Sequence, residues 1–290
     1  MPDILRAILL MVLGSFLFML ADLFMKLSTQ TMSIGLVTMM LGAGMGLFFL
    51  VLMQCAGTPV FDRRYLHFAV AMRCTGEAIG ITGVMIALAN SPLATVTALM
   101  QSLPLVLTVM GVVFLRESVG WRRVLALLAG LVGVLIIIRP GMEGFDFFAT
   151  LTLVGVLGMA IRDFGTRIAP QSISTAALSF YGSLTIVITG ALIVLVSGDW
   201  RPPVWTGMGH VVGLVVVGSL GTLAISTAMR LGDVSVISPF RYIRVVFGVG
   251  AGILVFGESV DSAVILGSTI VVGAGLYSWM RERKLALAGE

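Results

Sequence analysis

Long runs of apolar residues, each about twenty residues long, fill most of the chain. The first of them, ILLMVLGSFLFML, leads into ADLFMKLSTQ, where charged side chains return. Apolar and polar residues do not alternate along these runs, which argues against the strands of a membrane β-barrel. Runs of this length are typical of helices that cross a bilayer, because a helix satisfies its own backbone hydrogen bonds in lipid. The pattern predicts an all-α polytopic membrane protein.

Charged and turn-rich points divide the chain into ten predicted transmembrane helices joined by short connections. The predicted spans cover residues 4–26, 33–54, 65–88, 91–115, 119–138, 147–169, 173–197, 205–230, 234–257 and 260–280. Connections this short leave no room for a soluble domain. Within the fourth span, Pro104 is expected to bend the helix because proline frees a carbonyl group one turn earlier.

The two halves of the chain resemble each other at a constant offset of 141 residues. The offset pairs Gly14 with Gly155, Asp22 with Asp163, Gly80 with Gly221, Gln101 with Tyr242, and Glu117-Ser118-Val119 with Glu258-Ser259-Val260. We therefore expect a tandem repeat of a five-helix unit, residues 1–141 and 142–290. Because five is odd, the second unit enters the membrane upside down, which predicts an inverted-topology repeat.

The basic residues are distributed unequally between the two predicted sides of the membrane. The side of the N-terminus carries Arg6, Arg63, Arg64, Arg116, Arg122, Arg123, Arg167, Arg230, Arg281, Arg283 and Lys284, and the other side carries Lys26, Arg139 and Arg201. The positive-inside rule then predicts that both termini are cytoplasmic. We expect a multi-pass protein of a bacterial-type inner membrane.

The amino-acid composition also indicates the class of protein and its expected partners. Of the 290 residues, 58% are hydrophobic and only 11% are charged, and the mean hydropathy is +1.10, which indicates an integral membrane protein. No basic run with interleaved aromatic residues indicates a nucleic-acid partner. His67 and His210 lack metal-ligand spacing, and the chain has no phosphate-binding loop, so we expect no metal or cofactor. The expected partners are the lipid bilayer and a small-molecule substrate, and a monomer would suffice.

Two acid–base pairs occur at the ends of equivalent spans. Asp22 and Lys26 end the first span, and Asp163 and Arg167 end the sixth, each pair at a spacing that places both side chains on one helix face. They can act as ion pairs that anchor helix ends at the membrane interface. Alternatively, each pair forms a gate that binds a neighbouring helix in one access state only.

Charges also lie deeper in the predicted spans. Arg73 and Glu77 fall in the third span, and Arg244 falls in the ninth, where lipid-facing placement of a charge is unfavourable. These residues either form a buried strut, in which Glu77 neutralises Arg73 and an arginine of the ninth span, or line a hydrated cavity that binds a charged substrate. Gln101 and Tyr242, at equivalent positions of the fourth and ninth spans, could orient a ligand or bond helices together.

The segments LPLVLTVMGVVFLRESVGWRRVLALLAGLVGVLIIIRPG and SPFRYIRVVFGVGAGILVFGES resemble the EamA domain of the drug/metabolite transporter superfamily. The resemblance extends over the whole chain as two such units. It implies ten helices, cytoplasmic termini, and a central cavity lined mainly by the third, fourth, eighth and ninth spans. It also implies export of small metabolites.

The expected function is secondary transport by alternating access, with Arg73, Glu77, Gln101, Tyr242 and Arg244 as substrate-binding candidates. Amino acids, including aromatic and apolar ones, are the favoured substrates, as in YddG-like exporters of this superfamily. Alternatives are export or import of another metabolite, such as S-adenosylmethionine, a polyamine or a drug. A membrane-embedded enzyme would need a nucleophile–base pair or metal cluster that the sequence lacks, and a structural protein would lack a hydrated cavity.

Overall fold

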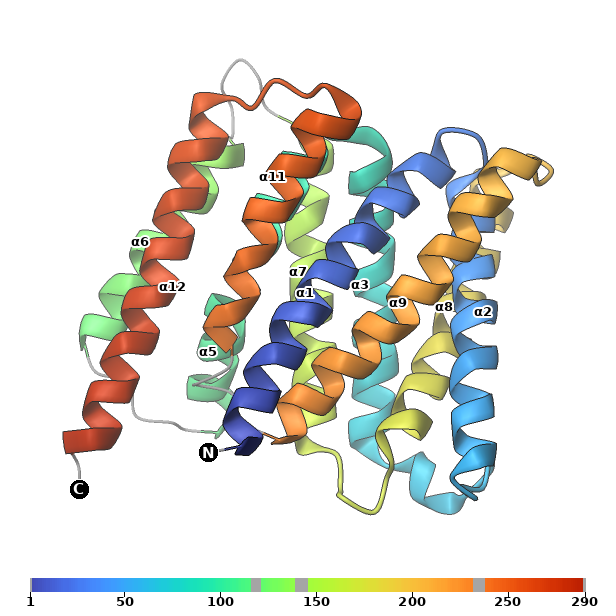
Figure 1. The fold of residues 1–290 in the computed structure, drawn as a ribbon, viewed down its shortest axis with the longest axis horizontal. Coiled ribbons are helices and arrows are strands. Elements are labelled where there is room, and N and C mark those ends of the chain that lie inside the picture. Colours follow the sequence, from blue (N-terminus) through green and yellow to red (C-terminus); the bar gives the residue numbers. More distant parts are fainter. Residues whose placement is uncertain (1, 116–120, 139–145, 232–237, 289–290) are drawn as a thin grey trace.

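The computed structural model describes residues 2–115, 121–138, 146–231 and 238–288, which form a bundle of helices (Figure 1). The first half contains α1 (Pro2–Thr29), α2 (Ile34–Cys55), η1 (Arg63–Leu66), α3 (Phe68–Asn90), α4 (Leu93–Met100), α5 (Leu103–Leu115) and α6 (Trp121–Ile138). The second half contains α7 (Phe147–Ile168), α8 (Thr175–Ser197), α9 (Trp205–Leu231), η2 (Ser238–Tyr242), α11 (Ile243–Phe256) and α12 (Ser262–Ala288). The chain begins and ends at the same end of the bundle (Figure 1).

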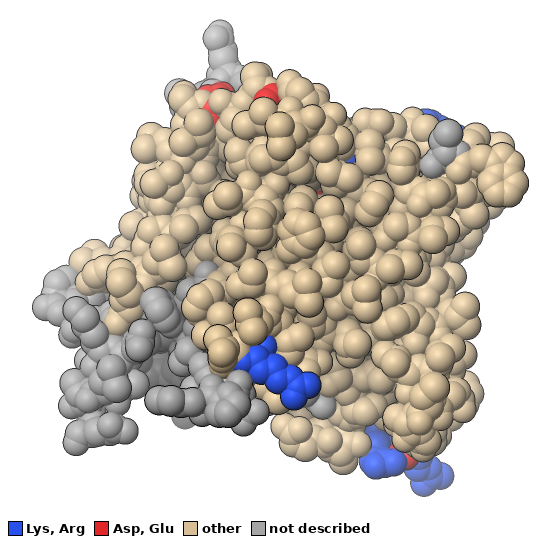
Figure 2. Space-filling view, viewed as in Figure 1, with Lys and Arg blue, Asp and Glu red and all other residues tan. Residues whose placement is uncertain are grey.

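Seven of the described segments are long and apolar enough to cross a membrane. They are Leu5–Thr29, Ile34–Cys55, Phe68–Asn90, Leu93–Gly111, Phe147–Ile168, Thr175–Ser197 and Gly207–Ala228, which match seven of the predicted spans to within a few residues. The predicted fifth and tenth spans contain the shorter apolar stretches Leu128–Ile138 and Ser262–Tyr277. The face shown in Figure 2 carries almost no charged side chains across its described middle, as a lipid-facing surface requires.

The fourth and ninth predicted spans are both interrupted. The fourth is divided into α4, which ends at Met100, and α5, which begins at Leu103 just before Pro104. The ninth passes from the 3₁₀ turns of η2 into α11 at Tyr242 and Ile243. The helix of the fourth span is therefore interrupted at Gln101 and Ser102, three and two residues before the Pro104 that was expected to disturb it.

Local sequence accounts for where several helices begin and end. Asp146 accepts a hydrogen bond from the backbone N–H of Phe148 at the start of α7, and Ser174 caps α8 through the N–H of Ala177. Gly198 and Gly257 follow α8 and α11 with φ near +60°, a conformation that glycine adopts without steric penalty. These signals lie at the membrane surfaces, where the apolar runs also end.

The most extensive helix contacts join the two halves of the chain. They pair α3 with α7, α1 with α9, α2 with α8, and α6 with α12. At the crossing of α3 and α7 the backbones touch, because a methyl group on Gly158 would lie 2.3 Å from the backbone nitrogen of Gly80. Without a hydrophobic driving force between helices in lipid, such small-residue contacts let dispersion forces hold the bundle together.

We expect Gly158→Ala to destabilise the protein by about 1–3 kcal/mol, because the added methyl group overlaps backbone atoms of α3 that have no rotamer to adopt. Thermal unfolding of the purified protein in detergent measures this. Gly250→Ala in α11 is the matched control, since nothing lies within 4 Å of a methyl group there. Equal unfolding temperatures for the two variants would contradict the close crossing of α3 and α7.

Candidate functional site

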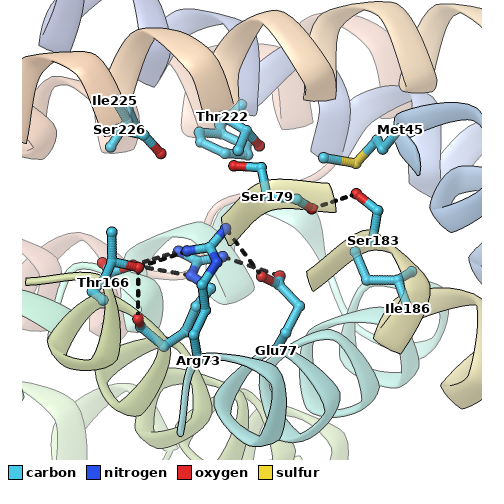
Figure 3. Close-up of a pocket in the computed structure, with 13 residues that line it drawn as sticks. Met45, Arg73, Glu77, Thr166, Ser179, Ser183, Ile186, Thr222, Ile225 and Ser226 are labelled. Carbon is cyan, nitrogen blue, oxygen red and sulfur yellow. Dashed lines mark hydrogen bonds and ion pairs between the residues drawn. The ribbon is translucent and has the colours of Figure 1, made fainter. Parts of the chain in front are cut away.

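A central cavity lies among the helices that join the two halves. Two chambers share Phe18, Met45, Glu77, Arg162, Ile186 and Thr222, so they form one continuous space. The larger, which we call the apolar chamber, has a volume of about 630 Å³ including its open part, and its wall includes Met25, Leu41, Met45, Ile81, Met100 and Met159. The second, which we call the polar chamber, is lined by the hydroxyl groups of Thr166, Ser179, Ser183, Thr222 and Ser226 beside charged groups (Figure 3).

The two chambers lie at different depths. In the polar chamber, Arg73 and Ser179 are five and four residues from the starts of α3 and α8, about 8 and 6 Å along each helix. The apolar chamber reaches Val84, sixteen residues from the start of α3, or about 24 Å. The polar chamber therefore lies nearer the end of the bundle where the chain begins and ends.

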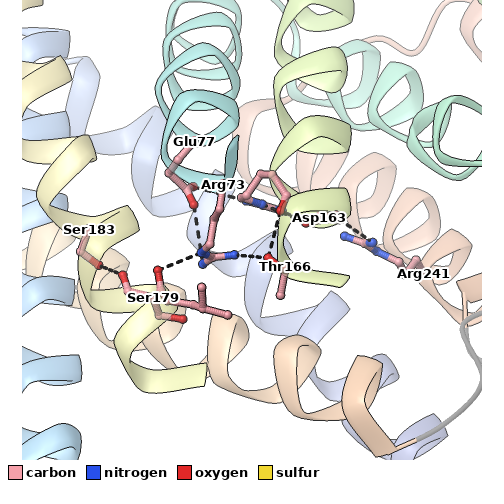
Figure 4. A network of polar contacts seen from close by, with 9 residues as sticks. Arg73, Glu77, Asp163, Thr166, Ser179, Ser183 and Arg241 are labelled. Carbon is pink, nitrogen blue, oxygen red and sulfur yellow. Dashed lines mark hydrogen bonds and ion pairs between the residues drawn. The ribbon is translucent and has the colours of Figure 1, made fainter. Parts of the chain in front are cut away.

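Arg73 is held in place by groups from three helices. Its Nε donates to the carbonyl oxygen of Leu178 on α8 at 2.9 Å, and one terminal nitrogen donates to Thr166 Oγ1 on α7 at 2.6 Å. The other terminal nitrogen lies 3.8 Å from a carboxylate oxygen of Glu77, one turn along α3 (Figure 4). The predicted pairing of Arg73 with Glu77 is therefore present, as a long contact.

Glu77 is shared between two arginines. Its second carboxylate oxygen lies 3.4 Å from a terminal nitrogen of Arg162 on α7. One of the two predicted alternatives, the buried strut, paired Glu77 with an arginine of the ninth span, whereas the structure places Arg162 of α7 beside it. The crossing of α3 and α7 explains the difference, because the backbone nitrogen of Arg162 would lie 2.3 Å from a methyl group on Gly76, one residue before Glu77.

Asp163 connects this network to the ninth span. One carboxylate oxygen accepts from Arg162 at 2.9 Å, and the other accepts from Arg241 at 3.1 Å. Neither arginine was the predicted partner, which was Arg167, in the last turn of α7. Tertiary packing places Asp163 inside the bundle, 6% exposed, so it does not act as a simple interface anchor.

The predicted pair of Asp22 with Lys26 is also replaced by partners from the second half. Asp22, 4% exposed, accepts a hydrogen bond from a terminal nitrogen of Arg244. The Lys26 ammonium lies 2.7 Å from Glu258 and 2.9 Å from the carbonyl oxygen of Ser91. α1 extends to Thr29, so Asp22 lies two turns inside the helix end, where a buried charge needs a partner from another helix.

Lys26 and Glu258 belong to a cluster that joins three segments of the bundle, which we call the end cluster. The two carboxylate oxygens of Glu258 accept from the backbone N–H groups of Leu93 and Ala94 at 2.8 and 3.1 Å. These groups begin α4 and have no capping side chain of their own, so Glu258 supplies the cap from the connection between α11 and α12. Lys26 also lies over the ring of Phe256, 4.9 Å from its centre.

Gln101 and Tyr242 have different surroundings. Gln101 lines a side pocket of the cavity with Arg241 and Arg244, and its amide donates to the carbonyl oxygen of Thr97 at 3.2 Å. The hydroxyl group of Tyr242 lies against α12, where it would overlap a methyl group on Gly275. Tyr242 therefore packs between helices, whereas Gln101 lines the cavity.

Two residues with clear roles in this geometry were not among the predicted site residues. Arg162 was passed over because it directly precedes Asp163 in what read as a helix-end segment. Glu258 was noted only as part of the repeated Glu-Ser-Val motif. The signal in the sequence was the equivalence of Asp22 and Asp163, which placed a charge at the same position of each repeat, but it did not identify their partners. Among the described residues, no group of three His, Cys, Asp or Glu side chains could hold a metal ion.

Residues 5–139 match the model of the EamA-like transporter family. The family is one of transporters, not of enzymes. A crystal structure with 18% sequence identity, covering 96% of this chain and 98% of its own, matches the fold with a TM-score of 0.67.

Bacterial relatives of this EamA-like chain are named as transporters of different solutes. An S-adenosylmethionine uptake transporter of Rickettsia bellii is 24% identical over 71% of this chain and 70% of its own length. A riboflavin transporter of Vibrio cholerae is 30% identical over 65% of each chain, and a pseudopaline exporter of Pseudomonas aeruginosa is 26% identical over 94% and 95%. The chain is therefore a multi-pass membrane protein whose bacterial relatives are named as transporters of small metabolites.

We expect Asp22→Asn to destabilise the protein by about 3–5 kcal/mol, because it leaves the Arg244 charge buried without its counter-charge. Thermal unfolding of the purified protein measures the loss. Asp22→Asn combined with Arg244→Met should recover much of it, since no unpaired charge then remains. Asp199→Asn removes an exposed partner of Arg201 and serves as the control, with little change expected. A wild-type unfolding temperature for Asp22→Asn alone would contradict the buried pair.

Proposed function

We propose that the protein is a secondary transporter that exports amino acids, including aromatic and apolar ones, by alternating access through the central cavity. The observation that carries the proposal is the combination of guanidinium and carboxylate groups with a methionine-rich wall in one buried space. Arginine matches the carboxylate of an amino acid, and Glu77 matches its ammonium group. Methionine side chains adapt to varied apolar or aromatic shapes. The resemblance to amino-acid exporters in the sequence supports the same choice.

A second candidate is a larger metabolite. The relatives are named for S-adenosylmethionine, riboflavin and pseudopaline, so the family's cavity accepts different solutes. S-adenosylmethionine contains the amino-acid group of methionine, so the polar chamber suits it for the same chemical reason. A competition experiment, in which such a metabolite is added against a labelled amino acid, distinguishes this candidate from amino-acid export.

The inverted repeat is part of this proposal, and several contacts support it. By the 141-residue offset, α3 is equivalent to α9, and α7 is equivalent to α1. The contact between α3 and α7 in one arrangement therefore corresponds to the contact between α9 and α1, and both pairs are closely packed. Equivalent glycines meet in both. A methyl group on Gly80 would lie 3.5 Å from the carbonyl oxygen of Gly155, and one on Gly221 would lie 3.6 Å from that of Gly14. The interruptions at Gln101 and Tyr242 also fall at equivalent positions, as expected for discontinuous helices near a transport site.

Alternating access requires a gate at each end of the cavity, and we assign one gate to the end cluster. With the predicted orientation, Lys26 and Glu258 lie on the periplasmic side of an inner membrane. Glu258 binds α1 through Lys26 and α4 through two backbone N–H groups, so moving α11 away from them breaks every one of these bonds together. The cluster thus favours a state that is closed on this side. At the other end of the cavity, Asp163 binds Arg241 of the neighbouring segment η2, so Asp163 is our candidate for the cytoplasmic gate.

We expect purified protein in liposomes loaded with unlabelled phenylalanine to accumulate radiolabelled phenylalanine transiently from outside. A carrier exchanges bound solute across the membrane, so the gradient of unlabelled phenylalanine drives the label uphill. Counterflow against protein-free vesicles measures it, with threonine, S-adenosylmethionine and spermidine as competitors. No accumulation by folded protein would reject phenylalanine as a substrate, and stronger competition by S-adenosylmethionine would favour the second candidate.

We expect Lys26→Met to expose the cavity to the periplasmic side. The reporter is Gly218→Cys in a protein without Cys55 and Cys74, because Gly218 lines the apolar chamber and its nearest side chain would lie 3.8 Å from an added methyl group. A membrane-impermeant maleimide added to intact cells should label this cysteine several times faster when Lys26 is replaced.

Arg63→Cys tests the orientation in the same cells and should not be labelled from outside. Labelling at residue 63 from outside would reverse the topology. Unchanged labelling at residue 218 after Lys26→Met, with Arg201→Met as the control for loss of a charge on the same side, would reject the gate.

A further inference from the structure

The polar chamber contains hydrogen-bonding capacity that the described residues do not use. Ser179, 2% exposed, lines the chamber, and its hydroxyl group has no hydrogen-bond partner (Figure 3). A buried hydroxyl group without a partner is unfavourable, so it marks a place where a ligand or water completes the site. Nearby, terminal nitrogens of Arg73 and Arg162 face Glu77 at 3.8 and 3.4 Å. A charge-assisted bond is about 2.7–2.9 Å long, so both guanidinium groups have room for a better acceptor.

The charges of the cavity do not balance. Four arginines line its chambers and side pocket, Arg73, Arg162, Arg241 and Arg244, against the three carboxylates of Asp22, Glu77 and Asp163. Asp22 balances Arg244. The excess positive charge therefore belongs to the three arginines that share Glu77 and Asp163. An anionic group is the ligand that removes this excess inside a low-dielectric bundle.

The position of the excess charge can be narrowed further. Asp163 is bound closely by Arg162 and Arg241, so Arg241 already has a short partner. Within the part of the chain that the structure describes, Arg73 has only the long contact with Glu77 as a charged partner (Figure 4). Arg162 also turns a terminal nitrogen towards Glu77. Arg73, Arg162 and the unpartnered Ser179 hydroxyl group line the same chamber, so an anion in that chamber finds donors from all three side chains.

We propose that Arg73, Arg162 and Ser179 form a carboxylate subsite that binds the head group of the transported amino acid. This inference rests on the proposed function. Glu77, between the two guanidinium groups, takes the ammonium group of the same molecule. The substrate side chain then extends into the apolar chamber, so the head group points to the end of the bundle where α3 and α8 begin. Arg162 and Ser179 become specificity-determining residues, and Arg244 remains a structural partner of Asp22.

Three compounds with the same ring test the subsite. They are phenylalanine, 3-phenylpropionate, which lacks the ammonium group, and phenethylamine, which lacks the carboxylate. Each is titrated into the purified full-length protein in detergent, and the affinity is taken from the rise in unfolding temperature. We expect phenylalanine and 3-phenylpropionate to stabilise the wild-type protein and phenethylamine to bind at least about tenfold more weakly.

Variants of Arg162 and Ser179 then test whether these two side chains donate hydrogen bonds to the carboxylate of the ligand. Arg162→Gln should weaken the binding of 3-phenylpropionate by at least about tenfold. Arg162→Lys keeps the charge but not the planar fork, so its affinity should lie between those of the wild type and Arg162→Gln. Ser179→Ala should weaken 3-phenylpropionate by about fivefold. Ser183→Ala is the matched control one turn along α8, because its hydroxyl group already donates to the carbonyl oxygen of Ser179 and should leave the affinity unchanged. The two serine variants decide the question if Arg162→Gln does not fold.

The outcomes separate this proposal from the proposed function. The subsite is overturned if 3-phenylpropionate does not stabilise the wild-type protein, or if its affinity is the same in Ser179→Ala and Ser183→Ala and in every folded Arg162 variant. If phenylalanine counterflow is observed but the Arg162 and Ser179 variants bind 3-phenylpropionate as the wild type does, amino-acid transport is supported and the subsite is rejected. Binding of 3-phenylpropionate that depends on Arg162 and Ser179, without phenylalanine counterflow, keeps the subsite and rejects phenylalanine as the transported solute.

Discussion

Charges inside a lipid-embedded bundle have to find counter-charges within the protein, because neither lipid nor bulk water compensates them. In this molecule almost every such partner comes from a distant part of the sequence. Asp22 of α1 binds Arg244 of α11, Lys26 binds Glu258, and Asp163 of α7 binds Arg241. Each pair therefore fixes two helices relative to each other at a stated depth. The arrangement of the cavity depends on these pairs, since they hold the helices that form its walls.

Close backbone contact between helices makes this pairing geometrically feasible. The glycines of α3 and α7 let the two backbones touch, and this contact brings Glu77 to Arg162 and Arg73 to Thr166. Larger residues at Gly76 or Gly158 would separate the helices and lengthen the contact between Glu77 and Arg162, which is already 3.4 Å. The small residues therefore serve two purposes, because they hold the bundle by packing and they set the distances between charged groups.

The cavity combines two environments that a transported amphiphile needs. Hydroxyl and charged groups line one chamber, and methionine, leucine and isoleucine line the other, with Glu77 and Arg162 at the boundary between them. The end cluster of Lys26 and Glu258 joins α1 to the start of α4 at the far end from the polar chamber. A bound solute would thus be desolvated on its apolar part while its charged groups exchange water for fixed partners, which is the usual composition of a small-molecule site.

The sequence by itself determined the membrane class, the approximate positions of the helices and the interruption before Pro104. These follow from local properties, since lipid requires long apolar helices and proline disrupts one wherever it occurs. It also identified Arg73, Glu77 and Arg244 as buried charges, because their depth along a helix can be counted. Only the tertiary structure decided their partners. Asp22 and Asp163 bind Arg244 and Arg241 of the ninth span instead of Lys26 and Arg167 of their own helices, and the roles of Arg162 and Glu258 were not predicted. A charge in a bundle binds the helix that packs against it, and that helix can come from anywhere in the chain.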